Sequence, residues 1–318
     1  MTRLRLPMPL ESKLWRLAGR AKQGSGTVGD VPAELLARLV RTNPRLVDLK
    51  ERYRHAPAPD QSFWGAWEEQ IDLRLFRGED EYVSQAYYRG TKRRYELTQA
   101  YVEATDDYGL LDVLTDDNRF GAKTFELVPG RVVTRDLLDS VLELGFLLRE
   151  LAWTRHSAVR VLDIGAGYGR FAHRFTTALP RAQVTCTDAV ATSTFLSELY
   201  LGFRGATRAE VVAFDETDSL DTRRFDLAVN IHSWSECTRE FIRFWLRRVA
   251  DLQVPYLLIV PHTPEFLTKE TDGRRVRYFD DIAAHGYERL VMRPKFARSA
   301  LVQRDGVHPA EYWLFRRV

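Results

Sequence analysis

The sequence predicts an α/β protein, with an open and mostly parallel sheet of seven strands that follows an α-helical N-terminal region. From Ser157 onward, short β-branched runs alternate with helical patterns, as they do in βαβ units. A glycine-rich turn joins the first of these runs to a helix. Before Ser157, signals for helix starts recur instead. We therefore place a boundary between Leu151 and Val159, with a helical region over 1–155 and a sheet domain over 156–318.

The helical region carries several helix entries. Asp30 and Pro32 precede one apolar run, and Asn43 and Pro44 precede another. A polar cap followed by proline suits a helix entry, because the first amides of a helix have no partner within it. The Gly- and Ser-rich residues 23–29 predict a flexible joint. Further helices are expected over 63–75, 92–104 and 135–152, the last of them capped by Thr134.

Seven runs in the sheet domain have the length and composition of strands. They are residues 159–164, 183–187, 210–214, 225–231, 256–260, 289–292 and 311–315. The helix after the first run places Phe171, Phe175 and Leu179 on one apolar stripe, which is the helical period.

Composition excludes several classes of protein. The 47 basic and 44 acidic residues nearly balance, so we expect no nucleic-acid partner. No run approaches the roughly 18 apolar residues of a membrane span, and the basic residues 1–10 lack the apolar core of a signal peptide, so we expect no membrane partner. Cys186 and Cys237 are expected to be free, buried thiols in a reducing compartment, which predicts a cytoplasmic protein.

The segment Val161–Phe171 reads Val-Leu-Asp-Ile-Gly-Ala-Gly-Tyr-Gly-Arg-Phe, and it runs from a buried strand through a glycine turn into a helix. Glycines suit such a turn because the backbone must adopt unusual dihedral angles and approach a ligand closely. A dinucleotide fingerprint would need glycine at the position of Arg170. The order found is instead acidic-x-Gly-x-Gly-x-Gly, which starts at Asp163.

This order resembles motif I of the class I S-adenosylmethionine-dependent methyltransferases. The resemblance implies a Rossmann-like fold, S-adenosyl-L-methionine as the cofactor and S-adenosyl-L-homocysteine as its product. It also implies that the turn packs along the amino-acid moiety and the ribose of the cofactor. The residues that would do so are Asp163, Gly165, Ala166, Gly167 and Gly169.

Two acidic residues follow the next strands. Asp188 lies about 20 residues beyond the glycine turn, where an acidic side chain of this fold accepts both ribose hydroxyls. The alternative is that Asp188 caps the following helix. Asp215 matches the region that reads adenine in the family, and the alternative is a solvated loop acid.

The exit of the fourth strand is rich in functional side chains. Asn230 and Ile231 are expected to face the cofactor, because ligands bind beyond the carboxyl ends of parallel strands. A hydroxyl acceptor gains from a general base, and histidine is the usual one, with an unperturbed pKa of about 6.5. His232 is the first candidate base, Glu236 could orient it or bind the acceptor, and His262 is a second candidate base. The alternative is that His232 only bonds backbone.

The segment Asn-Ile-His-Ser-Trp-Ser-Glu at 230–236 resembles the Asn-x-x-Ser-Phe-x-Glu signature of the bacterial sugar O-methyltransferase family. Three further stretches agree with that family, at 129–137, at 272–274 with 286–287, and at 312–316, so that the resemblance covers residues 63 to 318. The sequence departs from the family at Thr134, Arg135 and Cys237. The resemblance implies a small-molecule acceptor that is a sugar, a nucleotide sugar or a glycosylated natural product, used in biosynthesis.

The helical region is expected to bind the acceptor or act as a lid, and to supply contacts if the chain is a homo-oligomer. Residues 82–95 could line an acceptor pocket with tyrosines and Arg93 and Arg94, or they could form an ordinary helix with a solvated basic face. Asp272 and the pair Asp280 and Asp281 lack the spacing of metal ligands, so no metal is expected.

Three other functions compete with this interpretation. A methyltransferase could act on a nitrogen or on a hydroxyl of a non-sugar secondary metabolite. A non-catalytic protein could bind S-adenosylmethionine and serve as a partner or scaffold, although His232 and Glu236 argue against a decayed site. A nicotinamide oxidoreductase is disfavoured by Arg170.

Overall fold

The computed structural model describes residues 22–24, 31–56, 68–70, 72–77, 91–128 and 130–318. The chain divides into two compact units. The first consists of Met1–Leu39, Ile71–Trp153 and Arg293–Pro309, and the second of Val40–Gln70, Thr154–Met292 and Ala310–Val318. One division falls between Trp153 and Thr154, inside the interval that the sequence predicts. Two segments depart from the predicted division into 1–155 and 156–318. Residues 40–70 belong to the second unit, and residues 293–309 belong to the first.

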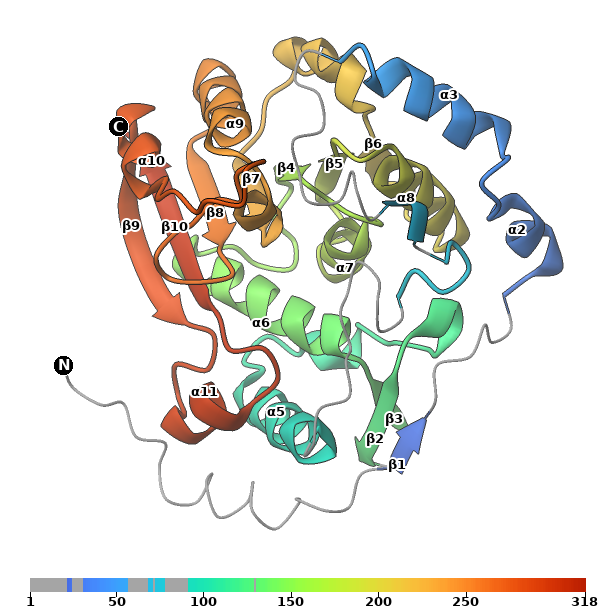
Figure 1. Ribbon diagram of the computed structural model, residues 1–318. Coiled ribbons are helices and arrows are strands. Elements are labelled where there is room, and N and C mark those ends of the chain that lie inside the picture. The colour runs from blue at the N-terminus through green and yellow to red at the C-terminus, as the bar shows by residue number, and fades with distance from the viewer. Residues whose placement is uncertain (1–21, 25–30, 57–67, 71, 78–90, 129) are drawn as a thin grey trace. The chain divides into compact units, whose positions relative to one another are not determined.

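The second unit is built on a seven-stranded sheet in the order β6-β5-β4-β7-β8-β10-β9 (Figure 1). The strands are β4 Arg160–Ile164, β5 Gln183–Thr187, β6 Ala209–Val211, β7 Leu227–Ile231, β8 Tyr256–Val260, β9 Tyr287–Pro294 and β10 Glu311–Arg317. The pairs within β6-β5-β4-β7-β8 are parallel, and β10 is antiparallel to β8. The order reverses between β4 and β7, which is where open α/β sheets bind their ligands.

Helices and 3-10 turns of this unit accompany the strands. They are α3 Pro44–Tyr53, α7 Arg170–Ala178, α8 Ala191–Phe203, α9 Arg239–Asp251 and α10 Phe279–Ala284, with η1 Glu68–Gln70, η4 Phe214–Thr222 and η5 Ser233–Glu236. α7 packs against β5 and β6, and α8 packs against β6 and α3. The apolar stripe that the sequence predicts on α7 is buried, because Phe171, Phe175 and Leu179 are at most 3% exposed. The apolar face that the helical period of 3.6 residues predicts for α7 is therefore part of the core.

The first unit combines helices with a small antiparallel sheet in the order β1-β2-β3. Its elements are β1 Lys22–Gly24, α2 Ala33–Arg38, α5 Thr91–Thr105, η2 Leu110–Asp112, η3 Arg119–Gly121, β2 Thr124–Val128, β3 Arg131–Val133, α6 Arg135–Glu150 and α11 Ala300–Asp305. The predicted cap Thr134 accepts a hydrogen bond from the Leu137 amide at 3.2 Å. The small sheet corrects the expectation of a purely helical region, and Gln23 and Gly24 lie in β1 rather than in a joint.

One predicted helix does not form where the chain is described. Residues 68–70 make a single 3-10 turn and 72–77 make turns, instead of the helix expected over 63–75. The Asp72 carboxylate accepts the Arg74 amide at 2.9 Å, and its carbonyl accepts the Leu75 amide at 2.9 Å. An Asp that binds the backbone two residues ahead gives the chain a turn in place of a helix. Residues 63–67 lie outside the described part.

The strand expected over 210–214 is also shorter than predicted. It ends at Val211, and the 3-10 helix η4 begins at Phe214. The Phe214 amide donates to the hydroxyl of Tyr53 at 2.8 Å. A side chain from a distant helix therefore takes the amide that a longer strand would have used.

The expected state of the two cysteines is confirmed. Cys186 and Cys237 are free and buried, and burial raises the pKa of the Cys186 thiol, with the charge of Asp163 adding to the effect. None of the helices in the described ranges has both the length and the apolar character needed to span a bilayer.

A buried ion group holds the first unit together. The Arg77 guanidinium is fully buried and lies 2.8 Å from Asp116 and 3.0 Å from Asp136, and both carboxylates are also fully buried. The Thr134 hydroxyl bonds both carboxylates, so the group continues into the cap of α6. Asp136 belongs to the stretch 129–137 that the sequence singled out, and the structure gives it this packing role.

We expect Arg77→Met to destabilise the protein by about 3–5 kcal/mol, because two buried carboxylates would lose their cation. The free energy of unfolding in urea measures this loss. Arg74→Met is the matched control, since Arg74 is 58% exposed and pairs with Asp72, two residues away. That control should change stability by about 0.5 kcal/mol or less. Equal losses in the two variants would contradict the role given to the buried group.

Candidate active site

The glycine turn follows β4 and shapes the backbone at the point where the sheet order reverses. Gly165, Gly167 and Gly169 all have positive φ, at 73°, 57° and 84°. The amides of Gly165 and Ala166 both donate to the Thr187 carbonyl, at 2.9 and 3.2 Å, which ties the turn to the end of β5. Positive φ strains any residue with a Cβ, so the glycines predicted for cofactor binding are required by the backbone itself.

Gly165 is also required by crowding. A Cβ on Gly165 would lie 2.0 Å from the Ser233 hydroxyl, well inside any tolerable contact. Asn230 fixes this approach, because its side-chain amide donates to the Ile164 carbonyl at 2.9 Å and to the Ser233 hydroxyl at 2.6 Å. Its side-chain oxygen accepts the Trp234 amide at 3.0 Å. Asn230 therefore joins the end of β4 to the segment that follows β7 by hydrogen bonds.

Asp188 connects the turn to the next helix. One of its oxygens accepts the Gly167 amide at 2.9 Å and the other accepts the Val190 amide at 2.8 Å. A carboxylate offers about four lone-pair sites, so a carboxylate that caps a helix can also accept other hydrogen bonds. The capping alternative and the ribose prediction are thus compatible. Asp163 lies buried in β4, 3% exposed, beside Cys186 in β5.

Three predicted catalytic residues lie together at the exits of β7 and β8. The rings of His232 and His262 are 5.1 Å apart between centroids. His262 Nε2 lies 3.8 Å from Glu236 Oε1, with side chains 37% and 22% exposed. The His262 amide donates to the Ser235 hydroxyl at 3.0 Å, which holds the two exits together. The structure thus brings together two imidazoles and a carboxylate from segments 26 or more residues apart in sequence.

The backbone at His232 is strained. It has φ 69° and ψ −33°, and its amide donates to the Val260 carbonyl at 2.8 Å. A residue with a Cβ in such a conformation costs roughly 1–3 kcal/mol, and positions of this kind cluster at functional sites. Ile231, the last residue of β7, immediately precedes it.

Lys269 is a residue near this group that the sequence did not indicate. Its amide donates to the Cys237 carbonyl at 2.9 Å. Burial lowers the pKa of Lys269, while the nearby charge of Glu236 acts in the opposite direction. The pattern of the sequence carried no signal for it, because the contact depends on the loop after β8.

Asp215 does not behave as a solvated loop acid. Its carboxylate accepts two hydrogen bonds from the Arg52 guanidinium, at 2.7 and 2.9 Å, and Arg52 also binds Glu216 at 2.6 Å. The neighbouring Tyr53 hydroxyl lies 2.8 Å from the Thr194 hydroxyl, so α3 is anchored to both α8 and η4. These α3 contacts are also absent from the predictions made from sequence. The adenine role of Asp215 stays a prediction.

The tyrosine-rich stretch is only partly described. Tyr82, Gln85, Tyr87 and Tyr88 lie outside the described residues. Tyr95 is buried in the first unit, where its ring stacks on Phe125 at 3.8 Å, so it does not line an open pocket. Arg93 and Arg94 are exposed, as a solvated basic face requires.

Two of the three acidic residues considered as metal ligands are engaged with arginines. Asp281 pairs with Arg239 and Arg243, at 2.6 and 2.7 Å, and Asp272 pairs with Arg274 at 2.5 Å. Within the described ranges, no group of three His, Cys, Asp or Glu side chains has the arrangement of a metal site.

Residues 132–233 match the family model of the methyltransferase small domain. The match spans the glycine turn, Asp188 and the exit of β7. No curated protein matches the chain.

Three solved structures illustrate what this chain is similar to. The [4+2]-cyclase SpnF is 16% identical, with 60% of this chain and 85% of that chain covered and a TM-score of 0.42. Magnesium protoporphyrin IX methyltransferase from Synechocystis, with bound S-adenosylmethionine, is 11% identical, with 58% and 83% covered and a TM-score of 0.41. The Burkholderia thailandensis 1,6-didemethyltoxoflavin-N1-methyltransferase is 20% identical, with 57% and 76% covered and a TM-score of 0.41.

The fold is thus the Rossmann-like class I methyltransferase fold that the sequence predicts. The family match supports a class I S-adenosylmethionine-dependent methyltransferase, with S-adenosylmethionine as the cofactor. The residues present fit that cofactor, because the glycine turn lets a ligand approach its backbone closely and the Asp188 carboxylate lies against that turn.

We expect Asp188→Ala to weaken the binding of S-adenosylhomocysteine at least tenfold, because two ribose hydroxyls and the Gly167 amide would lose their acceptor. Isothermal titration calorimetry measures the affinity. The matched control is Asp226→Ala, since Asp226 also accepts a strand-end amide, that of Arg160 at 2.7 Å, at the other edge of the sheet. The control should keep its affinity. Unchanged binding in Asp188→Ala would remove Asp188 from the cofactor site.

Proposed function

We propose that this protein transfers a methyl group from S-adenosylmethionine to a hydroxyl of a sugar, a nucleotide sugar or a glycosylated natural product. The observation that carries the proposal is the grouping of His232, His262 and Glu236 at the exits of β7 and β8. A hydroxyl keeps its proton at neutral pH and gains from a general base, whereas a free amine needs none. The resemblance of residues 230–236 to the sugar O-methyltransferase signature supports the sugar.

Each residue of the group has a distinct task in this proposal. When bound, the cofactor supplies a methyl group on a positively charged sulfur that leaves as a neutral thioether. His232 accepts the acceptor's hydroxyl proton as the oxygen–carbon bond forms and the carbon–sulfur bond breaks. Glu236, 3.8 Å from His262 Nε2, places a carboxylate beside the imidazole pair, where it can orient His262 or bind the acceptor. Asn230 and Ser233 hold His232 at a fixed distance from the glycine turn, which supplies the alignment that methyl transfer needs.

The first test is a thermal melt of the full chain with S-adenosylhomocysteine, with NAD as the control. A ligand at about 100 times its dissociation constant stabilises a protein by roughly 2.7 kcal/mol. We expect the midpoint to rise by several degrees with S-adenosylhomocysteine and not with NAD. A rise with NAD alone would overturn the proposed cofactor and favour an oxidoreductase.

The acceptor is tested by methyl transfer to glucose, to glucosamine, which has an amine in place of one hydroxyl, and to UDP-glucose. Methylation at oxygen, identified by mass spectrometry, supports the proposal. Methylation of the amine alone would replace it with an N-methyltransferase. Binding of S-adenosylhomocysteine without turnover on hydroxyl or amine acceptors would favour the non-catalytic alternative.

The base is tested by His232→Ala and His232→Gly. We expect both to lower kcat by about 10²- to 10⁴-fold, the usual contribution of a general base, and to keep the affinity for S-adenosylhomocysteine. The glycine variant should melt at a higher temperature than the alanine variant, because only glycine tolerates a φ of 69° without strain.

The matched control is His156→Ala, since His156 is exposed on the loop before β4. It should leave kcat unchanged. If His232→Ala keeps full activity and His262→Ala does not, the base is His262. If both keep full activity, the proposed general base is wrong.

A further inference from the structure

The opposite edge of the seven-stranded sheet carries a hollow of about 730 Å³. Its lining includes the first residues of three neighbouring strands, Arg160 of β4, Gln183 of β5 and Ala209 of β6, and residues 222–225 before β7. Parallel strands start at one edge of a sheet and end at the other. The hollow therefore lies about one strand length, roughly 16 Å for five residues, from the glycine turn. It does not belong to the candidate active site.

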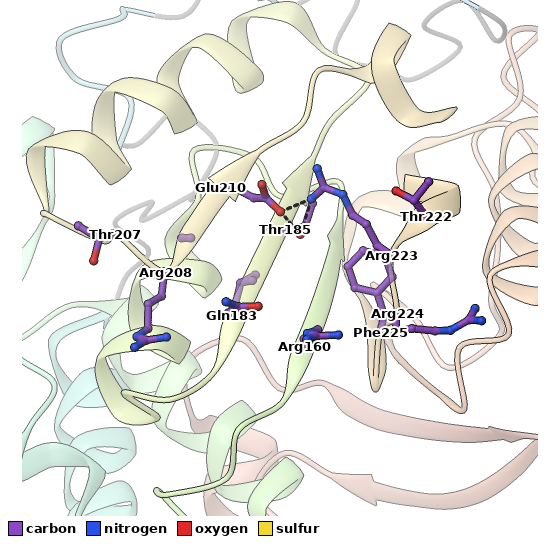
Figure 2. A pocket seen from close by; sticks show the side chains of 12 residues that line it. Arg160, Gln183, Thr185, Thr207, Arg208, Glu210, Thr222, Arg223, Arg224 and Phe225 are labelled. Atoms are coloured by element: carbon purple, nitrogen blue, oxygen red, sulfur yellow. Dashed lines mark hydrogen bonds and ion pairs between the residues drawn. The ribbon is translucent and has the colours of Figure 1, made fainter. Parts of the chain in front are cut away.

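The hollow is strongly basic. Four arginines line it, at positions 160, 208, 223 and 224, and Glu210 is the acidic residue among the twelve that line it. Arg223 is engaged, because its guanidinium bonds Glu210 and lies 3.4 Å from the Thr185 hydroxyl. Asp226, just outside the lining, directs one oxygen to the Arg160 backbone amide. Figure 2 shows Arg208 and Arg224 on opposite sides of Arg160.

Three of these guanidiniums are available to a ligand. Among the residues that the structure describes, no carboxylate forms an ion pair with Arg160, Arg208 or Arg224, and all three are exposed. Elsewhere in this unit arginines form ion pairs with acidic residues, as Arg45 does with Glu198 at 2.6 Å. Like charges held around one hollow raise the local positive potential, which an anion lowers.

The size and the spread of charge indicate the class of ligand. The volume lies within the range of roughly 300–1,000 Å³ for small-molecule sites. Guanidinium groups bind phosphate oxygens in pairs, and arginines on several sides suit a ligand with several phosphates better than a single anion. Gln183, Thr207 and Thr222 add uncharged polar groups to the lining. We propose that this hollow is a second ligand site, which binds a small molecule carrying two or more phosphate groups.

A small polyphosphate fits the hollow better than a nucleic acid. Proteins that bind single strands add aromatic faces on which bases stack. Phe225 is the aromatic residue among the twelve lining residues, and it is 6% exposed. The lining therefore offers charge without a stacking surface.

The test is calorimetric titration of the full chain with tripolyphosphate, ADP and AMP at low and at physiological ionic strength. We expect one tripolyphosphate per chain, with affinity that falls as salt rises, and weaker binding of AMP. Preference for ADP over tripolyphosphate would identify a nucleoside phosphate as the source of the phosphates. The reverse order would identify an inorganic polyphosphate.

Variants separate this site from general surface charge. Replacing Arg160, Arg208 or Arg224 by Gln should weaken tripolyphosphate binding about threefold each and about thirtyfold together, the size expected for exposed ion pairs. Glu210→Gln should tighten binding, because it removes the acid from the hollow and releases Arg223. Arg247→Gln is the matched control, since Arg247 is exposed on α9 outside the lining, and it should change nothing.

Several outcomes would overturn the proposal. One is no detectable binding of tripolyphosphate or ADP at low ionic strength. Another is equal binding by the triple variant and the unaltered protein. Displacement of tripolyphosphate by saturating S-adenosylhomocysteine would place the anion in the cofactor site instead. Tighter binding of a single-stranded RNA decamer than of tripolyphosphate would favour an RNA surface. These results do not depend on methyl transfer, so the proposed function can fail while this site stands.

Discussion

Asn230 holds together the two strand ends on which the candidate active site is built. Its amide group spans from the Ile164 carbonyl at the end of β4 to the Ser233 hydroxyl after β7, and its oxygen fixes the Trp234 amide. The side chain is 1% exposed, so these bonds form away from water, where an unmade bond is costly. Because the glycine turn follows β4 and His232 follows β7, this one residue sets the distance between the glycine turn and the candidate base.

Helix α3 fixes the other side of the site. Arg45 binds Glu198 of α8, Arg52 binds Asp215 of η4, and Tyr53 bonds Thr194 and the Phe214 amide. Each contact fastens α3 to an element that follows the carboxyl end of β5 or β6. The tyrosine hydroxyl both donates and accepts in a buried setting, and burial raises the pKa of Tyr53, which keeps it neutral and able to do both. A segment far away in sequence therefore shapes the loops where the adenosine of the cofactor is expected.

Sequence reasoning succeeded where the physics is local. The strand–turn–helix at Gly165, the cap at Thr134 and the runs of the large sheet follow from neighbouring residues, and the structure confirms them. It failed where distant residues decide the outcome. The strand expected over 210–214 ends early because of Tyr53, and residues 72–75 of the helix expected over 63–75 form a turn at Asp72 instead. The grouping of His232 with His262 lies between these cases, because sheet topology alone predicted that both would follow neighbouring strand ends.

The strained backbone at His232 bears on the role of its side chain. With φ 69°, glycine would be the more stable residue there, by an amount comparable with the roughly 1–3 kcal/mol cost of such a backbone. The chain places an imidazole there instead. Its ring centroid lies 5.1 Å from that of His262, and His262 in turn lies 3.8 Å from the Glu236 carboxylate. The backbone bonds of His232 to Val260 and Ser235 would form equally well with glycine. What glycine would remove is the ring, so the stability given up at this position supports a chemical role for that ring.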